Sequence, residues 1–326
     1  YQLRDSDSKA VFVFEGTPEL PMLEATKEAF DKVESCGELV VLTADLMGES
    51  PLPEHKTLMQ LTFDKSEHFD AYPTNPNDTC AILYTSGTTG QPKGAELTHL
   101  NLWSNSVTTY SIHMPLLDFT DQQQKSCLIT LPLFHTTGQT VQMNTQLYGG
   151  NRVVLLPRFE PRATLDTMVA EKINFWVGVP TMYWALLKYV KENDYDISHI
   201  ADNMKVCTSG GAPMPVNLMM EFQEKFGVRV MEGYGLSETS PLATTNHFEK
   251  PSKPGTVGQP IFGVDVRCFD DEDNEVPRGT RGEIVIRGTN VMKGYYKRPA
   301  ATAEAFRNGW FHTGDIGIQD EEGYIS

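Results

Sequence analysis

The sequence predicts an α/β fold with mostly parallel sheets flanked by helices, and a mainly antiparallel, distorted β-barrel-like part at the C-terminal end. Two observations predict the parallel sheets: short β-branched runs recur before residue 250, and longer amphipathic stretches separate them. Strands that alternate with helices form parallel sheets, because each helix returns the chain to the start of the next strand. A third observation, the change to closely spaced strands and turns after about residue 250, predicts the antiparallel part.

The N-terminal elements are a strand at 10–14, a helix near 19–34 and a strand at 39–42. Residues 47–79 are rich in Pro, Asp, Glu and Asn, which predicts a connecting surface loop. The next strand, at 80–84, leads directly into a loop of small residues. The loop therefore follows an ordered apolar strand and not a flexible linker.

Strand and helix then alternate through the middle of the chain. Strands are expected at 127–131, 152–156, 175–179, 206–207 and 229–231, with helices near 161–172 and 181–192. The strand-and-turn pattern occupies 254–258, 264–269 and 282–287, and 323–326 is a strand-like run. We expect three parts: a partial N-terminal α/β segment with its loop at 1–79, an α/β core at 80–250 and a β-rich part at 251–326.

Composition argues against several classes of protein. The 43 acidic and 27 basic residues give a net charge of −16, which disfavours binding to nucleic acid or to an anionic membrane surface. No stretch approaches the roughly 20 apolar residues that span a bilayer, and no signal core is present. The five cysteines form no CxxC pair, which predicts neither disulfides nor a zinc site. We expect a soluble, cytoplasmic protein.

The segment YTSGTTGQPKG at 84–94 has the composition of a phosphate-binding loop. Its glycines let backbone N–H groups approach a ligand, its hydroxyls can donate to phosphate oxygens, and its lysine supplies a cation. The candidate contacts are Thr85, Ser86, Gly87, Thr88, Thr89, Gly90 and Lys93. The segment is not a Walker A loop, in which Ser or Thr follows the lysine directly. Taken alone, such a cluster is more often a flexible turn between a strand and a helix.

Seven motifs together resemble the adenylate-forming (AMP-binding) superfamily, which contains acyl-CoA synthetases, luciferases and peptide-synthetase adenylation domains. In the family's order they are YTSGTTGQPKG at 84–94, LPLFHTTGQ at 131–139, GVPTMYWALL at 178–187, SGGAPMP at 209–215, EGYGLSETSP at 232–241, GEIVIRGTNVMKGYY at 282–296 and GWFHTGDIG at 309–317. They cover essentially the whole chain. The resemblance implies the stacked α/β subdomains of the family's large domain, with 80–250 as its AMP-binding core.

The resemblance also implies a reaction, in which a carboxylate attacks the α-phosphorus of ATP, pyrophosphate leaves, and the acyl group then passes to CoA. Such chemistry depends mostly on positioning and charge neutralisation. Lys93 would hold the departing phosphates, Thr85 and Glu238 would contact Mg²⁺, and His135 would act at the carboxylate or the phosphoryl group. Outside these motifs, Lys93 would more often be a surface lysine, Glu238 a helix-start carboxylate and His135 a core histidine.

The same resemblance assigns the nucleotide contacts. Tyr234 would flank the adenine ring, and Asp315 would accept hydrogen bonds from both ribose hydroxyls. The other implied contacts are Gly210, Gly211, Ala212, Glu232, Gly233, Gly235 and Ser237. Ser237 stands where many members carry threonine. Without the resemblance, Tyr234 would be a core aromatic and Asp315 a turn residue, and we expect His99 and His312 to be structural.

The motifs favour a fatty acid as the substrate. His135 stands where relatives that activate amino acids usually carry an aspartate, and the motif wording resembles bacterial and archaeal medium- and long-chain fatty acyl-CoA synthetases. An acyl chain would gain about 0.8 kcal/mol per buried CH₂ group. The implied pocket residues, which could equally be ordinary core, are Phe134, His135, Val179, Met182 and Met214. An aromatic- or short-chain-acid CoA ligase and a non-catalytic nucleotide- or acyl-binding module remain alternatives.

The family's small C-terminal domain, which carries a lysine that assists adenylation, would begin just after Ser326. The chain also begins at Tyr1 without methionine, and its N-terminal portion is shorter than in relatives. We therefore expect a piece of a longer protein that binds ATP and acyl-adenylate but catalyses adenylation poorly. The oligomeric state stays open, a homodimer included.

Overall fold

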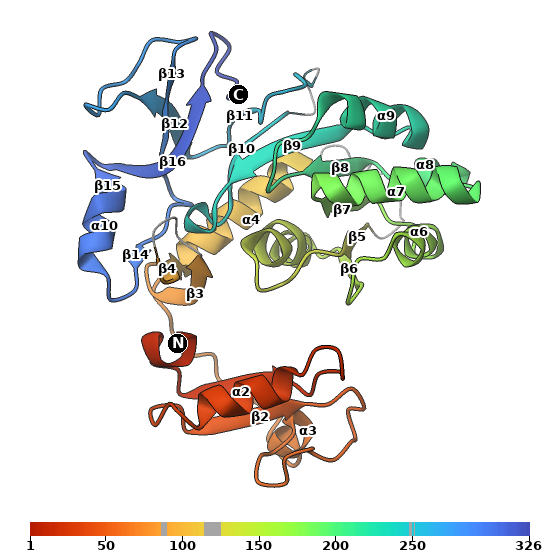
Figure 1. Ribbon diagram of the computed structural model, residues 1–326, viewed down its shortest axis with the longest axis vertical. Helices are drawn as coiled ribbons and strands as arrows, with labels where there is room; N and C mark the ends of the chain where they lie inside the picture. The colour runs from red at the N-terminus through yellow and green to blue at the C-terminus, as the bar shows by residue number, and fades with distance from the viewer. Residues whose placement is uncertain (86–89, 114–124, 248–249, 251) are drawn as a thin grey trace. The chain divides into compact units, whose positions relative to one another are not determined.

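The computed structural model describes residues 1–85, 90–113, 125–247, 250 and 252–326, and Figure 1 shows the order of its elements. The chain divides into two compact units, Tyr1–Thr74 and Asn75–Ser326, each with its own hydrophobic core. The three-part division expected from the sequence stays a prediction.

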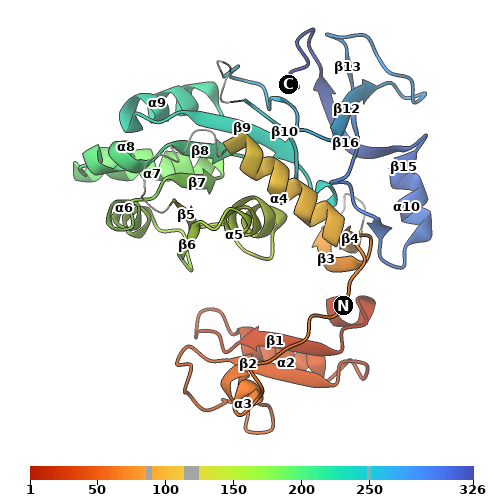
Figure 2. The ribbon, with the colours of Figure 1, turned by 180° about the vertical axis from the view of Figure 1, so that it is seen from behind.

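The first unit is a small α/β body. It contains α1 (Gln2–Asp5), β1 (Ala10–Phe14), α2 (Met22–Phe30), β2 (Glu38–Leu42) and α3 (Leu58–Thr62). Strands β1 and β2 pair in parallel, and α2 connects them and packs on them (Figure 2). The predicted strands are confirmed, but the surface loop expected at 47–79 contains α3. A capping box between Thr57 and Gln60 satisfies the first backbone N–H groups of this short helix.

A seven-stranded sheet forms the centre of the second unit. Its strands are β5 (Ser126–Ile129), β6 (Arg152–Leu155), β7 (Phe175–Gly178), β8 (Val206–Ser209), β9 (Val230–Gly235), β10 (Leu242–Thr245) and β11 (Gln259–Pro260), in the order β11-β10-β9-β8-β7-β5-β6. The five strands from β5 to β9 are parallel, and β10 and β11 are antiparallel. The chain passes from β5 to β6 on one side and then to β7 on the other, so the strand order reverses between β5 and β7. Ligands of open α/β sheets bind at such a switch point, beyond the carboxyl ends of the strands.

Helices cover both faces of this sheet (Figures 1 and 2). They are α4 (His99–His113), the π-helix η2 (Thr137–Asn144), α5 (Thr145–Tyr148), α6 (Pro161–Ala170), α7 (Pro180–Asn193), α8 (Ser198–Asn203) and α9 (Val216–Phe226). The 3₁₀ turn η3 (Ser237–Thr239) contacts β4 (Lys93–Thr98), and α10 (Pro299–Ala305) packs beside β14 (Gly294–Tyr295) and β15 (Phe306–Arg307). Neighbouring residues on one strand point to opposite faces. Phe175 accordingly belongs to one core, whereas Trp176 packs in the other with Tyr183 and Phe222.

Two antiparallel sheets complete the second unit. One consists of β12 (Val264–Phe269), β13 (Arg281–Gly288), β16 (Trp310–Ile318) and β15 (Phe306–Arg307), in that spatial order. The other consists of β14 (Gly294–Tyr295), β4 (Lys93–Thr98) and β3 (Thr79–Thr85). The fold class expected from the sequence, parallel α/β sheets followed by antiparallel strands, is confirmed. None of the helices in the described part of the chain is long and apolar enough to cross a membrane.

The structure defines three local features that the sequence left open or suggested differently. Residues 254–258 form a turn, because Gly255 and Gly258 have φ angles of +81° and +87°, outside the strand region. The run at 323–326 makes one isolated bridge, between Ile325 and Gln319, and no strand. The loop after β3 leads into strand β4, which pairs with β3, and not into a helix.

Candidate active site

A cavity of about 190 Å³ lies at the switch point of the seven-stranded sheet. The turns that follow β5, β8 and β9 form much of its wall, and Val141 and Val177 contribute apolar surface. The predicted site residues that line it are His135, Gly210, Gly211, Gly233, Tyr234, Gly235 and Ser237. The fold therefore brings three motifs, far apart in sequence, to one place.

A second cluster joins the phosphate-loop motif to the predicted metal ligand. Thr85, at the end of β3, stands opposite Lys93, the first residue of β4. The Thr85 hydroxyl donates to Glu238 Oε1 at 3.3 Å, and the Tyr295 hydroxyl donates to the same oxygen at 3.0 Å. The Lys93 ammonium lies 5.1 Å from the centre of the Tyr295 ring. Ser86, Gly87, Thr88 and Thr89, the middle of the predicted loop, lie outside the described residues.

The Glu238 carboxylate is fixed from several sides. Its residue is 7% exposed and sits in η3, and its backbone carbonyl accepts the Met292 N–H at 2.8 Å. Burial and the Glu238 charge raise the pKa of Tyr295, so its hydroxyl stays a donor. Tyr295 was not predicted as a site residue, because nothing in the GYY sequence shows that its hydroxyl reaches a residue 57 positions away.

The oxygen atoms of this cluster suit a hard divalent cation. Among the described residues, no group of three or more His, Cys, Asp or Glu side chains could hold a metal ion on its own. Mg²⁺ needs less from the protein, since it commonly binds through one or two carboxylates together with substrate phosphates and water. Thr85 and Glu238 offer a hydroxyl and a carboxylate side by side.

Tyr234 and Asp315 are directly bonded. The Tyr234 hydroxyl donates to Asp315 Oδ2 at 2.7 Å, although the two residues lie 81 positions apart. Burial, followed by the hydrogen bond to Asp315, raises the pKa of Tyr234. Asp315 itself is exposed at the surface. The two residues predicted to contact adenine and ribose thus form one polar unit beside the cavity.

His135 stands in the turn between β5 and the π-helix. Its Nδ1 accepts the Thr137 N–H at 3.2 Å, which leaves the proton of the neutral ring on Nε2. The ring is exposed overall but lies against the cavity wall, and this partial desolvation lowers its pKa. At neutral pH the imidazole can therefore donate a hydrogen bond from Nε2 without carrying a charge.

Other predicted residues lie away from the cavity wall. Glu232 is buried and its Oε1 accepts the Met214 N–H at 3.2 Å; burial raises its pKa. Phe134 is 82% exposed, Met214 is buried in the core with Phe222, and Val179 and Met182 are partly buried at the start of α7. Gly90 and Ala212 are exposed. Unpredicted lining residues include Thr137, Val141, Val177, Thr208 and Ser209.

Comparisons with known proteins agree on one family. The sequence model of the family described as AMP-binding enzyme matches residues 1–296. The chain is 38% identical to a long-chain-fatty-acid–CoA ligase of Bacillus subtilis (strain 168), over 80% of this chain and 46% of that protein. It is 37% identical to a feruloyl-CoA synthase of Amycolatopsis sp, over 78% of this chain and 50% of that protein. The chain thus spans about half the length of these relatives.

Solved structures agree with the sequence comparisons. Apo MatB from Rhodopseudomonas palustris is 32% identical with a TM-score of 0.84, covering 100% of this chain and 59% of MatB. O-succinylbenzoate coenzyme A synthetase (MenE) from Bacillus subtilis, in complex with ATP and magnesium ion, is 28% identical with a TM-score of 0.76, covering 99% and 60%.

Proposed function

Because the chain belongs to the AMP-binding enzyme family, we propose that it binds ATP and a carboxylic acid and forms the acyl-adenylate site of an acid–CoA ligase. The observation that carries this proposal is the convergence of three clusters in one unit of the chain. Thr85, Lys93 and Glu238 form the first, Tyr234 and Asp315 the second, and His135 at the cavity the third.

Each cluster suits one part of ATP. The Lys93 ammonium and the Thr85 hydroxyl can bind the oxygens of the departing pyrophosphate. Mg²⁺, held by Thr85 and Glu238, would neutralise charge on those oxygens. Asp315 can accept hydrogen bonds from ribose hydroxyls, and the Tyr234 ring lines the cavity beside it. The β- and γ-phosphates and the nucleoside thus receive separate contacts.

His135 serves the carboxylate end of the reaction. A neutral imidazole with its proton on Nε2 can donate to a carboxylate oxygen or to a phosphoryl oxygen as the acyl–phosphate bond forms. The bond to the Thr137 N–H orients the ring for this role. A positioned donor that costs no reorganisation lowers the barrier more than the same donor in water. In the second reaction of the proposed ligase, CoA sulfur would take the acyl group from AMP.

We infer that the acid is a fatty acid. The identity to the Bacillus subtilis long-chain-fatty-acid–CoA ligase supports this class, and so do the apolar cavity residues Val141, Val177 and Leu242. The nearly equal identity to the Amycolatopsis feruloyl-CoA synthase favours an aromatic acid as the second candidate.

Binding of non-hydrolysable acyl-adenosine analogues to this chain, followed by calorimetry, tests the proposal. The panel runs from acetyl to palmitoyl and includes one phenylpropenoyl analogue. We expect affinity to rise with chain length and then to reach a plateau, since each buried CH₂ group contributes about 0.8 kcal/mol. Tightest binding of the phenylpropenoyl or acetyl analogue would contradict a fatty acid. Failure to bind any analogue would contradict the proposed site itself.

A further inference from the structure

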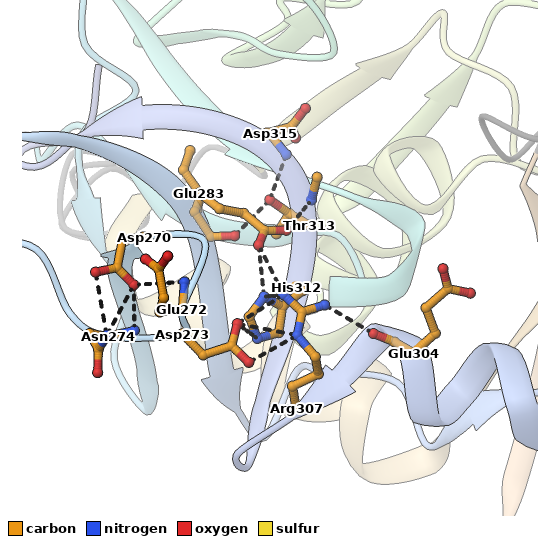
Figure 3. A network of polar contacts seen from close by, with 12 residues as sticks. Asp270, Glu272, Asp273, Asn274, Glu283, Glu304, Arg307, His312, Thr313 and Asp315 are labelled. Atoms are coloured by element: carbon orange, nitrogen blue, oxygen red, sulfur yellow. Dashed lines mark hydrogen bonds and ion pairs between the residues drawn. The ribbon is translucent and has the colours of Figure 1, made fainter.

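A polar network beside Asp315 has no part in the contacts described so far (Figure 3). It joins Asp273, in the turn after β12, to Arg307 on β15, Glu283 on β13 and His312 on β16. Arg307 Nε lies 3.1 Å from Asp273 Oδ2, and its Nη2 lies 3.4 Å from Glu283 Oε2. His312 is 7% exposed, so the network extends from the surface to a buried side chain of the antiparallel sheet.

The network meets Asp315 at an irregularity in the sheet. The paired residues Glu283 and Val285 are two positions apart on β13, but their partners on β16, Ile316 and His312, are four apart. Residues 313–315 therefore form a bulge. A bulge removes backbone groups from the strand ladder, and each lost partner must be replaced.

Glu283 replaces one of those partners. Its Oε1 accepts the backbone N–H of Gly314 at 2.9 Å, and Gly314 has a φ angle of +76° that favours glycine. The Thr313 hydroxyl adds a second anchor, because it donates to the Ile284 carbonyl at 2.7 Å and accepts the Asp315 N–H at 3.0 Å. Two neighbouring residues of β13 thus hold the turn that presents Asp315.

His312 and Arg307 hold the other oxygen of Glu283. His312 Nδ1 lies 2.8 Å from Glu283 Oε2 and 2.7 Å from Arg307 Nη2. Arg307 Nη2, which can only donate, bonds to Glu283 Oε2 in either tautomer of His312. Arg307 already has acceptors in Asp273 and in the Glu304 carbonyl. Both carboxylate oxygens of Glu283 are therefore fixed.

We propose that Glu283 is a positioning residue for nucleotide recognition: it clamps the Gly314 N–H and so orients the Asp315 carboxylate toward the ribose hydroxyls. This inference rests on the proposed function, in which Asp315 binds ribose. The bond from the Tyr234 hydroxyl to Asp315 Oδ2 constrains the same carboxylate from the side of the cavity. A carboxylate held from two directions loses little conformational entropy when ribose binds, which favours affinity.

Calorimetry with ATP, 2′-deoxy-ATP and 3′-deoxy-ATP on the complete 326-residue chain tests the clamp. Each deoxy analogue lacks one ribose hydroxyl that would donate to the charged Asp315 carboxylate. Wild type should therefore bind ATP roughly tenfold or more tightly than either analogue. We expect Glu283→Ala to lower that preference to about twofold, as Asp315→Ala does, and the double variant to be no worse than Asp315→Ala. Glu283→Gln keeps an acceptor for the Gly314 N–H, so it should keep the preference.

Glu275→Ala is the matched control, since Glu275 pairs with Arg267 in the same sheet and has no bond to the 313–315 turn. It should keep the wild-type preference. An unchanged preference in Glu283→Ala, or its loss in Glu283→Gln, would overturn the clamp. If the wild-type chain bound no nucleotide, the proposed function would be overturned. The role of Glu283 in nucleotide recognition would then be overturned too.

Amide exchange of Gly314 gives a readout that needs no ligand. Removing the acceptor in Glu283→Ala should speed exchange of the Gly314 N–H roughly tenfold or more relative to wild type and to Glu275→Ala. Equal exchange rates would overturn the proposed bond, whatever the nucleotide measurements show.

Discussion

Glu238 shows how the site depends on single atoms. Both hydroxyl donors, from Thr85 and Tyr295, bond to Oε1, and no donor among the described residues contacts Oε2. Two donors on one oxygen fix the rotation of a carboxylate and leave the other oxygen for the Mg²⁺ that we propose. Groups that orient a metal ligand in this way typically change metal affinity by about 10- to 100-fold when removed.

We expect Tyr295→Phe to weaken Mg²⁺-dependent ATP binding roughly tenfold. The variant loses the bond to Glu238 Oε1 but keeps the ring below the Lys93 ammonium. Calorimetric titration of ATP at several Mg²⁺ concentrations measures the change. Tyr324→Phe is the control, because its ring lies 5.0 Å from the Lys253 ammonium in the same manner, outside the site. Wild-type affinity in Tyr295→Phe would show that the hydroxyl does not orient Glu238.

At the residue scale, the sequence predicted Thr85, Lys93 and Glu238 because each stands in a motif whose spacing resembles a known family. It did not predict Tyr295 or Glu283, although both stand in the quoted 282–296 motif. Their roles depend on contacts with residues 57 and 31 positions away, and a spacing within one motif carries no information about such contacts.

At the element scale, α4 is an example of a helix that the sequence did not predict. Its buried residues are Asn101, Asn105, Ser106, Thr109 and His113, so no apolar stripe marks its inner face. Three of them, Asn101, Asn105 and Ser106, bond to backbone carbonyls. Asn105 Nδ2 donates to the Leu242 carbonyl at 2.7 Å, and Leu242 N donates to Asn105 Oδ1 at 3.2 Å. The strands and helices that were predicted, such as β7 and α7, bury apolar side chains whose period is visible in sequence.

His113, at the end of α4, makes folding stability depend on pH. Its ring lies 5.2 Å from the Phe175 ring, and burial lowers its pKa to about 4 from an ordinary value of 6.5. Because the folded protein binds this proton less readily than the unfolded chain, the stabilisation is complete above pH 6.5 and is lost as pH falls toward 4. Between pH 7 and pH 5 the loss from this residue should be about 2 kcal/mol.

Urea unfolding of wild type and His113→Leu at pH 7 and pH 5 isolates this contribution. The variant should lose less stability on acidification than wild type, by about 2 kcal/mol in the free energy of unfolding. His99→Leu, at the exposed start of the same helix, should behave like wild type. Equal pH dependence in wild type and His113→Leu would mean that the imidazole is not held neutral.

At the scale of the whole molecule, one of the two compact units contains all the described residues of the proposed site. Every described residue of the proposed site, from Thr85 to Asp315, belongs to the unit Asn75–Ser326. The unit Tyr1–Thr74 has a separate core around Val13, Leu23 and Val41. The sequence predicted the change from parallel to antiparallel strands, since that change alters local patterns. The division after Thr74 depends on which elements pack together, which local patterns do not show, and the parts expected from the sequence, with a boundary after residue 79, stay a prediction.

This division predicts that residues 75–326 bind nucleotide without the first unit. Because the second unit contains its own hydrophobic cores and all described site residues, its affinity for the best acyl-adenosine analogue should lie within about threefold of the complete chain. Calorimetry on the two proteins side by side measures the difference. Asp315→Ala within residues 75–326 is the control, and it should weaken binding as it does in the complete chain. A folded 75–326 protein that binds more than tenfold more weakly would show that Tyr1–Thr74 contributes to the site.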